Sequence, residues 1–293
     1  MLSTNQKKYL SDLSLLFVAF VWGGGFVAVK DALNTVTPMV LMSVRFVLAS
    51  IVLYLFLHRW IGKIDKNDLK KGSIVGVILY IAFAAQTFGL QYTTASKQGF
   101  LTATYVIMVP LIYWIFYKRR PSTKAIIGSL ITLVGIGLVS INATFTLNLG
   151  DGLTLICAFF FAAHIIAIEF FAKGMNVFKL AFIQIGVAAV LFVITALLTE
   201  PIPLSFTPRA WMAIIYLAVF STFACFTLQT VAQKYTSSSH VSIILSLESV
   251  FAALLGVILL GEVLTPIMLV GCALIFAAIL MVELNFSKKS KDV

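Results

Sequence analysis

Residues 241–261 read VSIILSLESVFAALLGVILLG, an almost wholly apolar stretch with one carboxylate, Glu248, near its middle. At helical spacing the small side chains form one stripe, which lets such a helix pack closely against a neighbour; they are Ser242, Ser246, Ser249, Ala253 and Gly256. An ionisable group at this depth in a bilayer costs about 2.5 to 3.5 kcal/mol and usually faces a protein interior or a wet cavity. The stretch therefore predicts a membrane-spanning helix, with Glu248 as the first candidate functional residue.

The whole chain has the composition of a membrane protein. Of its 293 residues, 61% are hydrophobic and 11% are charged, which leaves too little polar surface for a soluble domain of this size. Apolar runs of about 20 residues, the length that crosses roughly 30 Å of hydrocarbon, recur along it. We predict ten spans, at residues 13–30, 38–57, 73–91, 98–117, 124–142, 152–172, 178–198, 210–230, 241–261 and 265–284.

The formal charge of +10 is distributed unevenly between the two sides of these spans. If the N-terminus is cytoplasmic, the cytoplasmic side holds all 21 Lys and Arg residues except Lys30, Lys97 and Arg209 outside and Arg45 within a span. This asymmetry predicts a multi-pass protein of the cytoplasmic membrane with cytoplasmic N- and C-termini and contacts with anionic lipid. Because topology accounts for the basic charge, we expect no nucleic-acid partner.

Two residues in the first two spans are candidates for a central site. Trp22 lies near mid-membrane, where a buried indole needs a partner for its N–H, and the glycines at 23–25 fit either a close helix contact or a flexible cavity wall. Arg45 lies about 10 Å into the bilayer from the outer side, at about 1.5 Å per residue. It fits either a structural tether or a substrate or gating role, and a direct pair with Glu248 stays open.

Polar side chains in the later spans add further candidates. Spans three and four contribute Tyr80, Gln86, Thr102 and Tyr105, followed by Pro110, which is either a hinge or a fixed bend. His164 is either a hydrogen-bonded core residue or a proton relay. We interpret Gln184, Thr222, Thr227 and Gln229 mainly as packing residues. Cys157, Cys225 and Cys272 show no metal-ligand spacing, so we expect buried cysteines and neither a metal nor a cofactor.

The last five spans resemble the first five in plan. A shift of 143 residues lays residues 92–96 on 235–239, Gly128 on Gly271, and Tyr105 on Glu248. Because each half has an odd number of spans, the second half must insert upside down relative to the first. Secondary transporters have this architecture, with the binding site near the midplane between the repeats.

Three segments resemble the drug/metabolite transporter superfamily, of the type with two EamA repeats. They are VWGGGF at 21–26, TPMVLMSVRF at 37–46, and LESVFAALLG at 247–256 followed by Gly261, Glu262 and Gly271. The resemblance covers nearly the whole chain and implies an all-α membrane protein of ten transmembrane helices in two inverted five-helix repeats. It departs from the family at Ser249, where members often have proline, and at residues 118–120, which are basic where an acidic residue is usual.

The resemblance implies a division of the chain into four parts. These are a cytoplasmic N-terminal tail at 1–12, a first EamA-like repeat at 13–142, a second repeat at 151–285 and a basic cytoplasmic tail at 286–293.

We expect a secondary-active transporter that exports small metabolites such as amino acids by alternating access, with proton coupling as an option. The expected cavity residues are Trp22, Arg45, Tyr80, Gln86, Thr102, Tyr105, His164 and Glu248, and the expected coupling or gating residues are Glu248, His164 and Pro110. The partners are a small-molecule substrate and the lipid bilayer, in a monomer or homodimer. A multidrug or cationic-compound efflux carrier and a metabolite uptake carrier are the alternatives within this fold.

Two other classes fit the sequence less well. The chain has no phosphate-binding loop, no H-E-x-x-H motif and no nucleophile set, which argues against an enzyme or an ATP-driven pump. A structural or receptor-like membrane protein would not need charges at the midplane.

Overall fold

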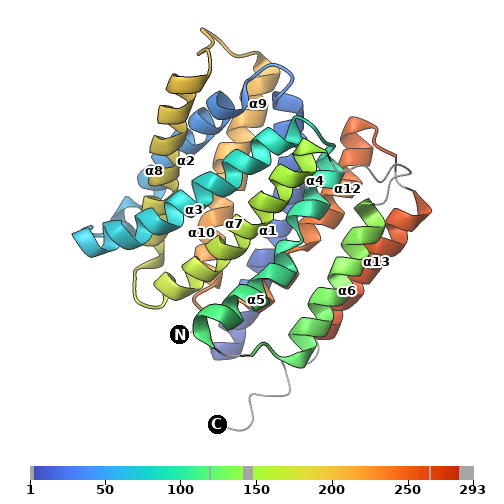
Figure 1. The fold of residues 1–293 in the computed structure, drawn as a ribbon. Coiled ribbons are helices and arrows are strands. Elements are labelled where there is room, and N and C mark those ends of the chain that lie inside the picture. The colour runs from blue at the N-terminus through green and yellow to red at the C-terminus, as the bar shows by residue number, and fades with distance from the viewer. Residues whose placement is uncertain (1–2, 119, 141–147, 264, 284–293) are drawn as a thin grey trace.

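The computed structural model describes residues 3–118, 120–140, 148–263 and 265–283, and these residues form helices and connections with no strand (Figure 1). The first half holds α1 (Thr4–Ala32), α2 (Pro38–Ile61), α3 (Lys66–Leu90), α4 (Ala95–Thr102), α5 (Tyr105–Tyr117) and α6 (Thr123–Ser140). The second half holds α7 (Leu149–Ala172), α8 (Val177–Thr199), α9 (Pro208–Tyr216), the π-helix η1 (Leu217–Ala224), α10 (Cys225–Ala232), α11 (Ser238–Leu245), α12 (Leu247–Leu260) and α13 (Pro266–Glu283).

These elements follow the predicted spans in order, with α4–α5, α9–η1–α10 and α11–α12 each filling one span. Among the described residues, 8 helical segments are long and apolar enough to cross a membrane, whereas α6 and α13 contain shorter apolar stretches, Ile126–Gly135 and Leu269–Ala278. The chain is therefore an all-α, multi-pass membrane protein.

The two halves repeat one another at the offset found in the sequence. The bounds of α4 and α11, and those of α6 and α13, differ by 143 residues. Thr94 caps α4 and Ser237 caps α11 through the same kind of side-chain bond, at the same offset. The halves also interleave, since α1 packs against α12, α2 against α8, α3 against α7 and α6 against α13 (Figure 1). A cavity at the centre is therefore lined from both repeats.

The prediction of one continuous helix over 241–261 is wrong, because the helix begins at Ser238 and breaks at Ser246. The hydroxyls of Ser242, Ser246 and Ser249 donate to carbonyls three residues earlier, at 2.9, 2.6 and 2.7 Å. Such local bonds compete with the regular helical pattern and tighten the turn. As a result, Glu248 lies in the first turn of α12 rather than in the middle of a long helix.

The matching break in the first half does not occur at Pro110. It lies at Ala103 and Thr104, while Pro110 remains inside α5. A proline leaves the carbonyl four residues earlier without its usual donor, and here the hydroxyl of Ser129 donates to that oxygen, on Val106, at 3.0 Å. The neighbouring helix therefore accommodates the proline within a continuous α5.

Several helices begin earlier than hydropathy indicates, because polar capping boxes start them. α1 begins at Thr4 and takes up much of the predicted tail at 1–12, while α3 begins at Lys66 instead of residue 73. The capping pairs are Ser3 with Gln6, Asp65 with Asp68, and Asn148 with Asp151 at the start of α7. A hydropathy window does not register these polar starts. The predicted tail at 286–293 lies outside the described residues.

The glycines at 23–25 make a close contact within an unbroken α1. A Cβ added to Gly23 would lie 2.4 Å from the Cβ of Phe251 and 2.9 Å from the backbone nitrogen of Ala252. One added to Gly24 would lie 2.7 Å from the hydroxyl oxygen of Tyr216. Glycine is therefore needed here for α1 to approach α12.

Each basic residue predicted on the outer side is tied to another element. Lys30 donates to the carbonyls of Leu90 and Thr93, Lys97 pairs with Asp151 at 2.8 Å, and Arg209 pairs with Asp31 at 2.7 Å. The two ion pairs connect the first repeat to the second. These exceptions to the charge asymmetry thus have structural partners.

Glu200, which follows α8, caps the start of α2. Its carboxylate accepts the backbone N–H groups of Met39 and Val40 at 2.9 to 3.1 Å, whereas Thr37 at the cap position makes no side-chain bond. We expect Glu200→Ala to lower the free energy of unfolding by about 1 kcal/mol, measured as a lower thermal midpoint in detergent. Glu200→Gln keeps one acceptor and should lose less. Equal midpoints for Glu200→Ala and the wild type would contradict the cap.

Candidate functional site

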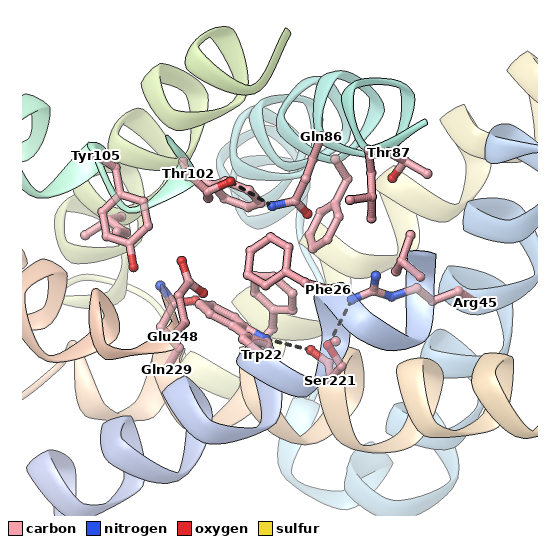
Figure 2. A pocket seen from close by; sticks show the side chains of 17 residues that line it. Trp22, Phe26, Arg45, Gln86, Thr87, Thr102, Tyr105, Ser221, Gln229 and Glu248 are labelled. Carbon is pink, nitrogen blue, oxygen red and sulfur yellow. Dashed lines mark hydrogen bonds between the residues drawn. The ribbon is translucent and has the colours of Figure 1, made fainter. Parts of the chain in front are cut away.

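A cavity with about 580 Å³ of unfilled space lies between the repeats, among α1–α5, α7, η1, α10 and α12 (Figure 2). Its wall is mainly apolar and aromatic, with a few polar side chains, which is the usual composition of a small-molecule site. The polar and indole groups are Trp22, Arg45, Gln86, Thr87, Thr102, Tyr105, Ser221, Gln229 and Glu248.

Two residues expected in the cavity, Tyr80 and His164, lie outside it. The hydroxyl of Tyr80 bonds Thr195 at 2.6 Å in the contact between α3 and α8. At 100° per residue, Tyr80 is about 120° around α3 from Gln86, so the two cannot face the same cavity.

His164 is buried behind the cavity wall. Its Nε2 bonds the amide oxygen of Gln184 at 2.8 Å, and its ring packs edge-on against Phe226, which itself lines the cavity. It precedes the cavity-lining Ile165 by one residue, about 100° around the helix. Of the two interpretations open in the sequence, the placement matches a hydrogen-bonded core residue.

Glu248 is buried, with 3% of its surface exposed, and its carboxylate makes no ion pair among the described residues. The side chain of Tyr105, its counterpart in the repeat, points toward it (Figure 2). The buried Tyr105 hydroxyl is close enough to interact electrostatically with Glu248 but makes no hydrogen bond of ordinary geometry. The space between them can therefore accept a polar group of a ligand.

Arg45 is also buried and contacts the opposite part of the cavity wall (Figure 2). Its Nε donates to the hydroxyl of Thr222 at 2.7 Å and its Nη2 to the hydroxyl of Ser221 at 3.2 Å. The guanidinium carbon lies 4.6 Å from the ring centre of Phe83. No ion pair joins Arg45 to Glu248 in the described part of the chain, so the direct pair left open by the sequence does not form.

Trp22 has the N–H partner that its burial requires. The indole nitrogen donates to the backbone carbonyl of Ser221 at 2.9 Å, and the ring packs against Phe226 with centroids 5.0 Å apart. Ser221 lies in the π-helix η1, whose sequence, LAVFSTFA, contains no proline or glycine that would mark an irregular helix. The sequence analysis therefore predicted a bond but not its acceptor.

Amides and hydroxyls connect the helices at the upper wall of Figure 2. Gln86 donates to Thr102 at 3.5 Å, and Gln98 donates to the backbone carbonyl of Gln86 and, at 3.3 Å, to Thr154 of the second repeat. The sequence analysis identified Gln86 and Thr102. It interpreted Gln229 and Thr222 as packing residues and did not single out Thr87 or Ser221, because a polar residue in an apolar span does not reveal which face it occupies.

The described residues hold no group of three or more His, Cys, Asp and Glu side chains that could bind a metal. Cys157 and Cys225 are buried and free.

Comparison with known proteins gives a family for the chain. The model of the EamA-like transporter family matches residues 10–141 and 148–284. An uncharacterized transporter of Archaeoglobus fulgidus is 37% identical over 279 residues, covering 95% of this chain and 87% of the relative. A S-adenosylmethionine/S-adenosylhomocysteine transporter of Chlamydia muridarum is 24% identical over 298 residues, covering 92% and 93%. A solved crystal structure has the same fold, with a TM-score of 0.79 at 18% identity, covering 94% of this chain and 98% of that one. With two matched repeats across nearly its whole length, the chain belongs to the EamA-like transporter family.

Proposed function

We propose that this membrane transporter is a secondary-active exporter of small zwitterionic metabolites such as amino acids, which bind in the cavity between the repeats. One observation supports the proposal above all: the cavity contains two buried opposite charges, Arg45 and Glu248, that do not pair with each other. A buried charge without a partner costs several kcal/mol. A zwitterion would supply the missing counter-charge at both places.

The cavity wall offers a position for each part of such a substrate. The ammonium group binds Glu248 beside the Tyr105 hydroxyl, and the carboxylate binds Arg45. The apolar part packs on the rings of Trp22 and Phe226, which line the cavity. Burial of both charges away from water strengthens these contacts.

One relative supports this substrate class. The C. muridarum protein is named for S-adenosylmethionine and S-adenosylhomocysteine. Both compounds have an α-amino acid group, so both have the pair of charges that this cavity would neutralise. The identity of 24% makes this support for the class of compound rather than for either compound.

Alternating access follows from the inverted repeat, because the two halves can exchange conformations around a central site. With the N-terminus in the cytoplasm, the cavity opens in turn to the cytoplasm and to the outside of the cytoplasmic membrane. Glu248 binds either the ammonium group or a proton, and this competition couples export of the substrate to entry of a proton. His164 and Pro110 lie outside the cavity wall and have no contact with the substrate in this scheme.

The proposal is tested by thermal unfolding of the detergent-purified protein with each of the twenty amino acids, their decarboxylated amines and their deaminated acids. A ligand at 100 times its Kd stabilises the folded state by about 2.7 kcal/mol. We expect a raised midpoint for some amino acids and a smaller rise for the matching amine and acid. Compounds that bind should then exchange in proteoliposome counterflow. Stabilisation by lipophilic cations but by no amino acid would favour multidrug efflux and overturn the proposal.

A further inference from the structure

We propose that Ser221 and Thr222, in the π-helical turn η1, are positioning residues that hold the Arg45 guanidinium so that one nitrogen, Nη1, is the anion ligand of the cavity. This inference rests on the proposed function. It identifies the residues that determine the preference of the site for a carboxylate.

The π-helical turn provides an acceptor that a regular helix would not. In an α-helix the N–H of Cys225 would bond the carbonyl four residues earlier, on Ser221. Here it bonds the carbonyls of Phe220 and Thr222 instead. The Ser221 oxygen accepts the indole N–H of Trp22 at 2.9 Å. Single π-helical turns of this kind occur frequently at functional sites.

The same turn directs two hydroxyls at Arg45, which comes from the other repeat. Thr222 accepts from Nε at 2.7 Å and Ser221 accepts from Nη2 at 3.2 Å. A guanidinium is planar, so two bonds along one edge determine its plane and the direction of the third nitrogen. One residue pair thus orients both Arg45 and Trp22.

The third nitrogen remains available to a ligand. The contact of Nη1 within the described residues is the sulfur of Met42 at 4.0 Å, which is a weak acceptor. The guanidinium is buried, contacts the face of Phe83 and has no carboxylate partner in the described part of the chain. A buried cation with two neutral acceptors and one unused donor group is suited to an anionic group that enters the cavity (Figure 2).

Thr222→Val tests this role, because valine matches threonine in shape and lacks the hydroxyl. Thr222→Ser retains the hydroxyl and serves as the rescue variant. Thr227→Val is the matched control, since Thr227 lies one turn further along and its hydroxyl bonds the Phe223 carbonyl of its own helix at 2.6 Å. Ser221→Ala, which removes the Nη2 contact alone, gives a second measurement with the same expected direction.

The probes are the amino acids that stabilise the wild type and their α-carboxamides, titrated by thermal shift. We expect Thr222→Val to weaken amino-acid binding about tenfold, because a bond that orients a charged group is lost. Carboxamide binding should stay the same, so the preference for the carboxylate narrows. Thr222→Ser and Thr227→Val should behave as the wild type.

The outcomes separate the inference from the proposed function. If Arg45→Gln and Glu248→Gln weaken binding while Thr222→Val and Ser221→Ala do not, the positioning role is wrong and the proposed function stands. If no amino acid stabilises the wild type, or if Arg45→Gln and Glu248→Gln bind as the wild type does, the proposed function fails and the inference fails with it.

Discussion

Glu248→Gln is expected to abolish transport while the protein stays folded. Glutamine has nearly the same shape as glutamate but cannot neutralise an ammonium group or exchange a proton. A hydrogen bond to a charged group contributes about 1.5 to 3 kcal/mol, so we expect a loss of substrate affinity of about 10- to 100-fold. Because the carboxylate is buried without an ion-pair partner in the described residues, the amide should leave the thermal midpoint unchanged or raise it. Proteoliposome counterflow and thermal unfolding in detergent measure the two effects.

Glu169 provides the matched control for this experiment. It is equally buried, at 3% exposure, but its carboxylate pairs with Lys173 at 2.8 Å and accepts the backbone N–H of Ser238 at the start of α11. Glu169→Gln should therefore lower the thermal midpoint and leave substrate affinity unchanged. Normal transport by Glu248→Gln would remove both the substrate role and the coupling role of that residue.

Gly23→Ala is expected to reduce stability more than other glycine substitutions in the membrane-spanning helices that have open space around them. The new Cβ would lie 2.4 Å from the Cβ of Phe251 and 2.9 Å from the backbone nitrogen of Ala252, so α1 and α12 must separate. Overpacking of this kind costs about 1 to 3 kcal/mol. The new Cβ would also lie 3.0 Å from the carbonyl oxygen of Glu248, so the cavity should change shape as well. A lower thermal midpoint together with weaker amino-acid binding is the expected result.

The control for Gly23 is Gly186→Ala, since a Cβ at Gly186 would meet nothing within 4 Å. Alanine favours a helix by about 1 kcal/mol over glycine, so this variant should be as stable as the wild type or more stable. Equal midpoints for Gly23→Ala and Gly186→Ala would show that the contact between α1 and α12 is not closed at residue 23.

The fold was largely predictable because the bilayer imposes long apolar runs, which are visible in a sequence. The offset of 143 residues returned in the bounds of α4 and α11 and in those of α6 and α13. The breaks within spans were not predicted. The break at Ser246 depends on serine hydroxyls bonding nearby carbonyls, and similar serines occur in continuous helices.

The candidate site was predicted in its residue types and less well in its contacts. Trp22, Arg45, Tyr105 and Glu248 were singled out as costly or unusual groups in a membrane, and all four line the cavity. Tyr80 and His164 have the same polar character but face other helices. Helical rotation is too uncertain from span boundaries alone to separate the two cases.

The sequence by itself determined that this chain crosses the membrane as two inverted helical repeats with buried charges near its centre, because transfer into hydrocarbon depends on each residue's own chemistry. The tertiary structure alone decided the partners of those charges. Arg45 meets Ser221 and Thr222 instead of Glu248, and Trp22 bonds a carbonyl left without the N–H of Cys225. These contacts join residues far apart in the chain. They depend on helix rotation and on one π-helical turn, which packing between helices determines and local sequence does not.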